Sequence, residues 1–300
     1  MDEREHYQFV ADERELEWFY RFAVPRIERD NVLFLSLSAR NKCLTREERE
    51  IFMLGRSEMM KKTIIRKNGF SYFLETLYSL ECHKKGMLTK ARKPYPQKCL
   101  RVYWNLNPTS VRKVIFEQQR MINDYTSEMI DASLKGSKAA IDSAFHKMRR
   151  TFDATLSLYA RNSAERMWID FELDYVERPS DVKQAALIGM ARDWLINLVG
   201  PGNFLIISSP GGLHFPIRRC MLRFNPVQLK FALEGITGEL GVACKEIERN
   251  ENLMVVLPGT FAYDQDGAAM TPRVMNKDDF TIENEIFKEE IASAEEDGTM

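Results

Sequence analysis

Short stretches in which apolar and polar residues alternate recur along the chain, and this period of two is typical of β-strands with one buried face. We expect strands at residues 32–40, 63–67, 101–108, 166–173, 203–209, 214–224, 242–248 and 253–263. Apolar residues recurring every three or four positions predict helices at 12–30, 45–63, 71–85, 109–160, 180–198 and 226–240. Because several expected strands follow one another among the helices, the pattern predicts an α+β fold with a mixed, largely antiparallel sheet flanked by helices.

Composition and charge narrow the class of protein. The 300 residues are 44% hydrophobic and 29% charged, with a formal net charge of −1, which fits a globular protein. Five cysteines form no Cys-x-x-Cys pair, which favours a reducing compartment. The N-terminus is acidic, unlike a signal peptide, and no apolar run approaches the roughly 20 residues of a membrane span. We therefore expect a cytoplasmic protein with no membrane partner.

Three acids follow one another at every second position in the stretch ERMWIDFELD, residues 165–174. On a strand, Asp170, Glu172 and Asp174 would share one face. Carboxylates this close repel one another unless a cation lies between them, and oxygen ligands suit Mg²⁺ or Mn²⁺. The alternative is a solvent-facing strand that carries ordinary surface acids.

The segment SSPGGLHF, residues 208–215, runs from an apolar strand into a turn and a histidine. Glycine lets backbone N–H groups approach a phosphate closely, and hydroxyl and imidazole groups add donors. The candidate phosphate-binding residues are Ser208, Ser209, Gly211, Gly212 and His214. Arg218 and Arg219 follow, but strand alternation lets only one of them face the site. The alternative is a plain β-turn followed by a structural histidine.

In combination, these motifs resemble those of the archaeo-eukaryotic primase superfamily, the primase–polymerases, over roughly residues 165–263. The first motif of that family is an apolar run followed by Asp-x-Asp or Asp-x-Glu, and Asp170 and Glu172 match it. The second motif is Ser/Gly-x-His, which Gly212–His214 matches. Residues 1–150 match no motif of the family that can be carried over residue by residue.

The third motif and a later element of the family are also present. The third motif is an apolar residue before an acid, which Ile247 and Glu248 fit best, with Glu246 as the alternative acid. Many phage and plasmid members carry an LPGT-like element, and Leu257–Thr260 matches it. The resemblance implies an RRM-like catalytic module at 151–280, after an N-terminal α/β module at 1–150 and before an acidic tail at 281–300.

The activity that the resemblance implies is template-dependent nucleotidyl transfer, as in a DNA primase or DNA polymerase, by a two-metal-ion mechanism on single-stranded DNA. Asp170, Glu172 and Glu248 would be the catalytic ligands of Mg²⁺ or Mn²⁺. The turn at 208–212, His214 and Arg218 would bind a ribo- or deoxynucleoside triphosphate. Because the chain has no Walker A sequence, a helicase would have to act in trans.

A basic segment, residues 83–101, holds seven Lys or Arg and no acid, and its glycine and prolines predict a loop. It could bind template phosphates, or it could be only a solvated loop. The candidate nucleic-acid contacts are Lys84, Lys85, Lys90, Arg92 and Lys93. Zinc is not expected at the nearby ligands Cys43, Cys82, His83 and Cys99, because their spacing is poor for a zinc site.

Two other functions are consistent with the same residues. A metal-dependent nuclease could use the acids Asp170 and Glu172, although the Ser/Gly turn and His214 favour nucleotide binding. A non-catalytic, nucleic-acid-binding replication subunit could share the fold, but it would have no need of clustered acids.

Overall fold

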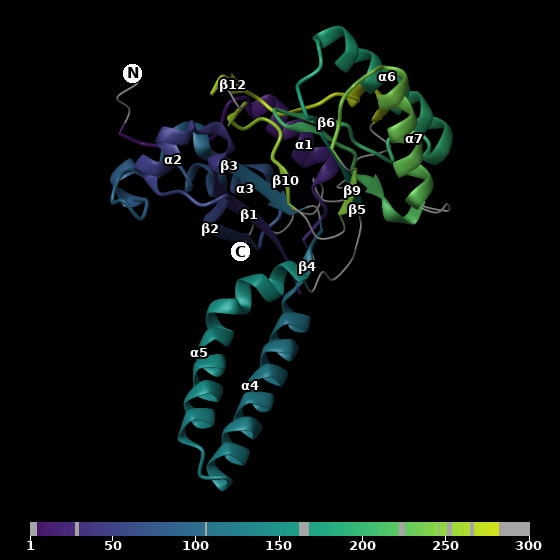
Figure 1. Ribbon diagram of the computed structural model, residues 1–300. Helices are drawn as coiled ribbons and strands as arrows, with labels where there is room; N and C mark the ends of the chain where they lie inside the picture. The colour runs from purple at the N-terminus through teal and green to yellow at the C-terminus, as the bar shows by residue number, and fades with distance from the viewer. Residues whose placement is uncertain are drawn as a thin grey trace, which may run out of the picture.

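Two antiparallel β-sheets, each accompanied by helices, form the body of the protein, and a helical hairpin projects from it (Figure 1). The computed structural model describes residues 5–27, 30–105, 107–161, 168–221, 226–245, 247–250, 254–264 and 267–281. Every strand pair within these ranges is antiparallel. The α+β class and the largely antiparallel sheet expected from the sequence are confirmed.

The first sheet has the strand order β10-β3-β1-β2, with β4 beside β1. Its strands are β1 (Asn31–Arg40), β2 (Ser57–Ile65), β3 (Leu100–Asn105), β4 (Thr109–Ser110) and β10 (Met254–Val256). On one face of β1, Leu33, Leu35 and Leu37 join side chains of α1 (Glu13–Ala23) and α3 (Phe70–Tyr78) in one core. The other face is also buried from Val32 to Ser36. This sheet and its helices form the first lobe.

The helix expected at residues 45–63 is wrong over its second half. α2 (Arg46–Phe52) begins at a capping box formed by Thr45 and Glu48, but it ends at Met53, whose φ of 50° is left-handed. The next residues form β2, which pairs with β1 over Ser57–Ile65. Hydrogen bonding along β1 therefore outweighs the local helical pattern.

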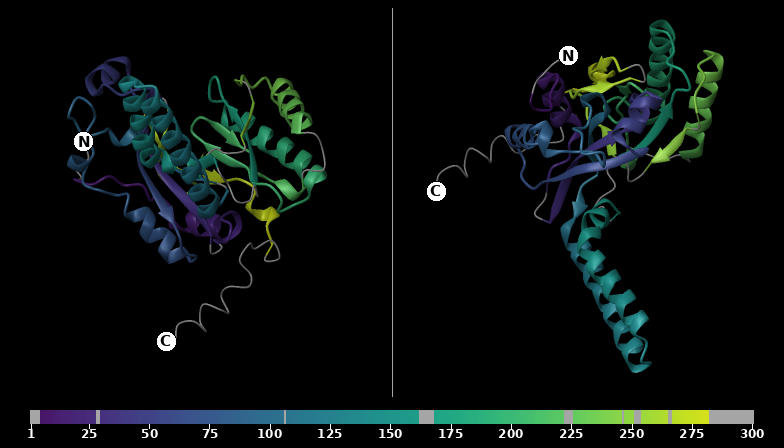
Figure 2. Two further views of the ribbon diagram at one scale, coloured as in Figure 1. Left: turned by 90° about the horizontal axis from the view of Figure 1, so that it is seen from below. Right: turned by 60° about the vertical axis from the view of Figure 1, so that its left-hand side comes forward.

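The helical stretch expected at residues 109–160 is two antiparallel helices, α4 (Val111–Leu134) and α5 (Lys138–Arg161). Gly136, with a φ of 64°, lies in the turn between them. The backbone N–H of Ser137 donates to the carbonyl of Ala132 at 2.9 Å and closes the end of α4. The hairpin extends away from both sheets (Figures 1 and 2).

The second sheet has the strand order β13-β6-β7-β5-β8, and β9 also pairs with β5. Its strands are β5 (Trp168–Asp174), β6 (Ile207–Ser209), β7 (Gly212–His214), β8 (Ile217–Arg218), β9 (Glu248–Asn250) and β13 (Arg273–Val274). α6 (Asp181–Val199) and α7 (Pro226–Glu239) lie against this sheet and complete the second lobe (Figure 1). The strand expected at 242–248 is confirmed in part: β9 begins only at Glu248, but before it Cys244 forms an isolated antiparallel bridge with Tyr175, and the Lys245 N–H donates to the Asp174 carbonyl at 2.8 Å.

The chain returns to the first lobe after β9. β10 pairs with β3, and the Leu257–Thr260 turn follows it. The carbonyl of Gly259 accepts hydrogen bonds from the backbone N–H groups of Ala11 and Asp12 at 2.9 and 3.0 Å. Gly259 has a φ of 79°, and a β-carbon there would lie 2.7 Å from the Asp12 carbonyl. The LPGT element therefore fixes the beginning of α1, and a small hairpin of β11 (Ala262–Tyr263) and β12 (Ala269–Met270) comes after it.

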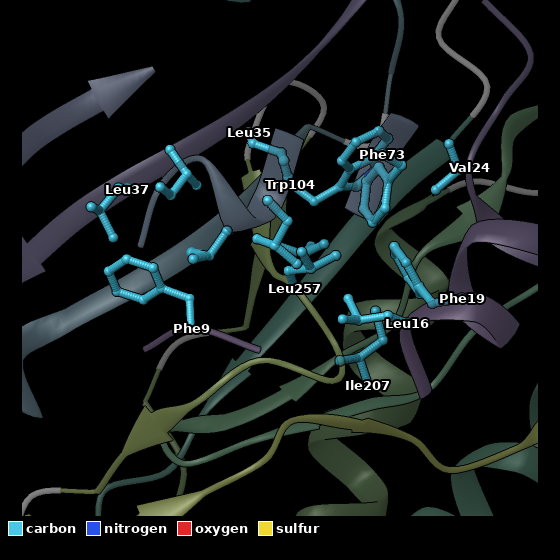
Figure 3. Close-up of a cluster of buried hydrophobic side chains, with 14 of the residues drawn as sticks. Phe9, Leu16, Phe19, Val24, Leu35, Leu37, Phe73, Trp104, Ile207 and Leu257 are labelled. Atoms are coloured by element: carbon cyan, nitrogen blue, oxygen red, sulfur yellow. The ribbon is translucent and has the colours of Figure 1, made fainter. Parts of the chain in front are cut away.

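The larger of two hydrophobic clusters joins the lobes. Figure 3 shows side chains of α1, β1, α3 and β3 around Leu257, together with Ile207 of the second sheet. The expected division at residues 150 and 280 stays a prediction; its first boundary falls within α5, and the tail after Thr281 lies outside the described residues. Of the helices within the described ranges, none is long and apolar enough to cross a membrane.

Candidate functional site

The two faces of β5 have different chemistry. Ile169, Phe171 and Leu173 point into the core under α6 and α7, and all three are buried. Strand alternation places the remaining residues on the opposite face, which we call the acid face. The acid face of β5 carries Trp168, Asp170, Glu172 and Asp174. The sequence prediction that these acids share a face of a strand therefore agrees with the observed strand.

Asp170 is held by the histidine of the second motif. His214 Nδ1 lies 2.9 Å from Asp170 Oδ2, and both side chains are buried. Across the β5–β7 ladder, His214 is the direct partner of Glu172, so the first and second motifs meet on adjacent strands. The second carboxylate oxygen, Asp170 Oδ1, is also buried and has no hydrogen-bond partner among the described residues. A buried acceptor without a partner lowers stability, and a bound cation would remove that cost. The lone pairs of Asp170 Oδ1 are therefore available to a cation.

The charges on this face influence one another. Burial raises the pKa of Glu172, and Asp174 and Asp170 raise it further, whereas His214 and Lys42 lower it. Burial alone would lower the pKa of His214, but the charge and hydrogen bond of Asp170, together with Glu172 and Asp174, raise it to about 9. His214 is therefore protonated at neutral pH, where it can bind an anionic oxygen.

The backbone pairing of β9 gives the position of the expected third acid, Glu248, relative to β5. β9 runs along β5, and Glu248 pairs with Glu172 while Asn250 pairs with Asp170. In an antiparallel ladder directly paired residues share a face, so position 248 lies on the acid face. The side chain of Glu248 and the whole of Glu246 lie outside what the structure describes. The choice between these two acids as a ligand stays a prediction.

The turn of the second motif reaches the end of the acid face. Ser209 pairs with Gly212, which in turn pairs with Asp174, and Ser209 Oγ donates to the Gly212 carbonyl at 3.2 Å. Gly212 is required because a β-carbon there would lie 1.8 Å from the Leu173 carbonyl. Ser208 lies elsewhere: its hydroxyl accepts a hydrogen bond from Gln184 of α6 at 3.1 Å. The structure thus brings Ser209 and Gly212 to the acids and does not bring Ser208.

Lys42 is a residue of this site that the sequence analysis missed. It follows β1 of the first lobe, and its ammonium group lies against the turn, since a β-carbon added to Gly211 would be 2.9 Å from Lys42 Nζ. Burial lowers the pKa of Lys42, and Arg101 and Arg40 lower it further, whereas Asp174 and Cys43 raise it. The local sequence Arg-Asn-Lys-Cys gives no signal for this role, because it arises from the approach of the two lobes.

Arg218 lies on the acid face at the other end of β5. It pairs with Trp168, and its guanidinium group lies 5.6 Å from the centre of the Trp168 ring. Burial lowers the pKa of Arg218. Arg219 begins the short helical turn after β8 and is exposed, which agrees with the expectation that only one of the two arginines faces the site. Asn107 holds the Trp168 backbone through two hydrogen bonds of 3.0 and 2.9 Å.

The basic loop lies at a different part of the first lobe. Its turn is ordered, because Thr89 and Lys93 exchange backbone and side-chain hydrogen bonds and Arg92 has a φ of 56°. Lys85, Lys90, Arg92 and Lys93 are exposed, and Lys84 is half-buried. The hydrogen bonds of this segment run to several parts of the first lobe: the Lys84 N–H donates to the Glu5 carbonyl at 2.8 Å, and Lys98 Nζ donates to Glu48 Oε1 at 2.7 Å. No hydrogen bond or ion pair described for Lys84, Lys85, Lys90, Arg92 or Lys93 joins them to the acid face.

The donors on the acid face fit a divalent cation of the magnesium type. Mg²⁺ is usually held by one or two carboxylates, with water and substrate phosphate oxygens completing an octahedron. Asp170 and Glu172 supply such a pair, and Asp170 Oδ1 supplies an oxygen with no other partner in the described part of the chain. Within the same residues, no three His, Cys, Asp or Glu side chains are spaced to hold a metal by themselves. The expectation about zinc at Cys43, Cys82, His83 and Cys99 stays a prediction.

Comparisons with protein-family models, with curated proteins and with solved structures find no match for the chain. The chemistry of the site therefore has to be argued from its geometry. That geometry is a pair of carboxylates beside a buried histidine, with a serine–glycine turn and a lysine at one end.

Proposed function

We propose that the protein is a template-dependent nucleotidyltransferase of the DNA primase or DNA polymerase type, acting on single-stranded DNA with Mg²⁺ or Mn²⁺. The observation that carries this proposal is the buried Asp170 Oδ1, which has no partner among the described residues although it lies beside Glu172 and His214. A buried carboxylate that serves only stability is expected to have both oxygens paired.

The metal ligands in this proposal are Asp170 and Glu172, with Glu248 as the third acid. When bound there, divalent cations supply activation of the attacking 3′-hydroxyl and neutralisation of charge on the leaving diphosphate. The carboxylates of the chain do the positioning: β5 fixes their spacing, and His214 fixes the orientation of Asp170. Rigid placement matters because an error of about 1 Å in a reacting group can cost a hundredfold in rate.

The nucleotide would bind along the β6–β7 turn. Ser209, Gly212 and His214 lie at one end of the acid face, and Lys42 approaches the same turn from the first lobe. Protonated His214 and the Lys42 ammonium group would hold oxygens of the triphosphate by charge-assisted hydrogen bonds. The two lobes would then both contact the nucleotide, so that its binding links them.

The template would contact positive surface away from the acids. Lys84, Lys85, Lys90, Arg92 and Lys93 are proposed to neutralise phosphates of single-stranded DNA, which is the main source of affinity in such complexes. A separate helicase would expose the template strand. We propose the cytoplasm as the site of action, in agreement with the free thiols of all five cysteines.

One experiment separates this proposal from a nuclease and from a binding subunit. The full-length protein is incubated with Mg²⁺ or Mn²⁺, nucleoside triphosphates and a labelled single-stranded template with and without a primer. Product longer than the primer, or new product without one, is expected from the wild type and not from Glu172→Gln. Shortened template would assign a nuclease, and a mobility shift without either product would assign a binding subunit.

A further inference from the structure

A pocket of about 450 Å³ lies where the helical hairpin leaves the first sheet. Its floor is formed by Val32 of β1 and Ile64 of β2, and its wall is formed by the first turns of α4. The pocket, which we call the root pocket, is lined by Asp30, Asn31, Val32, Ile64, Arg66, Val111, Arg112, Ile115 and Phe116. Its volume is within the range of small-ligand sites, roughly 300–1,000 Å³.

The lining of the root pocket combines apolar surface with two guanidinium groups. Ile115 is 57% exposed and Phe116 is 64% exposed, although both are large apolar side chains. The guanidinium group of Arg112 lies 5.8 Å from the centre of the Phe116 ring. Across the pocket, Arg66 is exposed at the end of β2. Within the described residues, no acidic side chain forms an ion pair with either arginine.

This chemistry fits a nucleotide unit better than a purely apolar ligand. An aromatic ring with a guanidinium group beside it is a common platform for a nucleobase, and stacking of this kind tolerates every base. Arg66 and Arg112 could each neutralise a phosphate. Asp30 and Asn31 at the rim supply oxygen acceptors for the amino groups and ring N–H groups of bases.

The root pocket is also connected to the acid strand. Val32 lies on the same face of β1 as Ser36, and Ser36 pairs with Tyr103 of β3. The Tyr103 hydroxyl accepts a hydrogen bond from Arg40, at the end of β1, at 3.2 Å. At the other edge, β4 pairs with Val32, and Asn107, two residues before β4, holds Trp168 at the start of β5. The base of the pocket and the start of β5 are therefore held together through β4 and Asn107.

We propose that the root pocket binds one nucleotide of a single-stranded nucleic acid, with the base against Phe116 and Ile115 and the backbone phosphates at Arg66 and Arg112. This inference rests on the proposed function in one respect, since the strand is taken to be the template. It adds a site at the base of the helical hairpin, separate from the basic loop at residues 83–101.

Binding of a fluorescent oligothymidylate of about 16 nucleotides to the full-length protein, without divalent metal, tests the pocket. Phe116→Ala is expected to weaken binding by roughly fivefold or more, the scale of a lost base–aromatic stack. Arg66→Gln and Arg112→Gln are each expected to reduce the slope of log affinity against log salt by roughly 0.7. Matched controls are Phe145→Ala, 49% exposed on α5, and Arg46→Gln, whose side chain is 93% exposed on α2.

Ultraviolet cross-linking of an iodouridine-substituted oligonucleotide gives an independent readout that does not depend on the variants folding well. The expected cross-linked peptide contains Ile115 and Phe116. Unchanged affinity of Phe116→Ala, an equal loss in Phe145→Ala, or cross-links confined to other parts of the chain would overturn the proposal. Displacement of the oligonucleotide from the pocket by low concentrations of dTMP would overturn it in favour of a free-nucleotide site.

These experiments distinguish a failure of the root-pocket proposal from a failure of the proposed function. If the wild type extends primers while Phe116→Ala binds the oligonucleotide normally, the pocket is wrong and the activity stands. If the wild type extends no primer but Phe116→Ala loses affinity and the cross-link maps to α4, the pocket stands as a nucleic-acid site and the activity is wrong.

Discussion

Two buried aspartates of the second lobe are paired very differently. Asp279 has a side chain that is only 3% exposed, and both of its oxygens accept hydrogen bonds from Arg192 Nε at 3.0 Å, while Asn276 donates to Oδ2 at 3.2 Å. Asp170 is 1% exposed, but its only described partner is His214 on one oxygen. Asp279 is thus saturated by the protein, and Asp170 is not.

The difference shows what each carboxylate contributes. The Asp279 pair joins α6 to the C-terminal segment, and its geometry has no vacancy for a further ligand. Asp170 lies on the acid face of β5, beside the half-buried Glu172 and opposite the Asn250 position of β9. A carboxylate kept buried with one unpaired oxygen costs stability, and such a cost is typical of sites that bind something else. We therefore propose that Asp279 has a structural role and Asp170 a functional one.

The largest expected effect separates the two aspartates by activity. Asp170→Asn is expected to lower primer extension by at least about a hundredfold, the scale on which loss of a group that stabilises transition-state charge is felt. Asp279→Asn should leave the rate per folded molecule within about threefold of wild type, because it is remote from the acid face. Extension rates at saturating nucleotide, normalised to folded protein, measure both. Near-normal extension by Asp170→Asn would break the distinction.

Stability should show the reverse order. Asp279→Asn leaves Arg192 with a weaker partner and should lower the free energy of unfolding by about 1–3 kcal/mol, less than for a fully buried pair because Arg192 is 38% exposed. Asp170→Asn should stay within about 1 kcal/mol of wild type, because His214 can lose its proton once the carboxylate is gone, the amide can still bond to the neutral ring, and acid–acid repulsion is relieved. Urea unfolding curves measure both quantities. A larger loss for Asp170→Asn would make that residue the structural one.

The partner of Asp170 provides a sharper test of its role. His214→Ala is expected to raise the nucleotide concentration needed for half-maximal extension by about tenfold, the size of a lost hydrogen bond to a charged group. The affinity for a single-stranded oligonucleotide should not change. Titrations of nucleotide and oligonucleotide against one preparation compare the two. Equal loss of both affinities would indicate that His214 only supports the fold.

The smallest expected effect is on template affinity and concerns the charged side chains of the basic loop. Replacing Lys84, Lys85, Lys90, Arg92 and Lys93 by glutamine should lower template affinity about threefold at physiological salt. The slope of log affinity against log salt should fall by roughly 0.7 for each side chain that contacts a phosphate. Melting temperature serves as the control for folding. An unchanged slope would identify the loop as a solvated surface.

Much of the second lobe is readable from sequence because its signals are local. The alternation of Ile169, Phe171 and Leu173 with the acids fixes which face of β5 is buried, and the Ser/Gly turn before His214 is specified by the close approach at Gly212. The ends of helices are harder to predict from the sequence. α2 stops at Met53 because β2 pairs with β1, a long-range effect that no local pattern contains.

Other features of the site depend on how distant segments meet. Lys42 comes from the first lobe, and the pairing of Asp170 with His214 spans 44 positions, so neither contact has a signature in neighbouring residues. The root pocket likewise requires that α4 begin at Val111, directly after β4 has paired with β1, and the periodicity over 109–160 does not show that pairing. By contrast, nearness in sequence to the turn predicts that Ser208 joins the site, but strand alternation points its side chain to the opposite face, toward α6.

The most direct test of the account is Mn²⁺ binding to the metal-free protein. The loss of the free-ion signal in electron paramagnetic resonance measures this binding. The wild type and Asp279→Asn are predicted to bind Mn²⁺ equally, whereas Asp170→Asn should bind it at least about tenfold more weakly. Binding of Mn²⁺ by Asp170→Asn as tightly as by the wild type would contradict the claim that the unpaired oxygen of Asp170 belongs to a cation site.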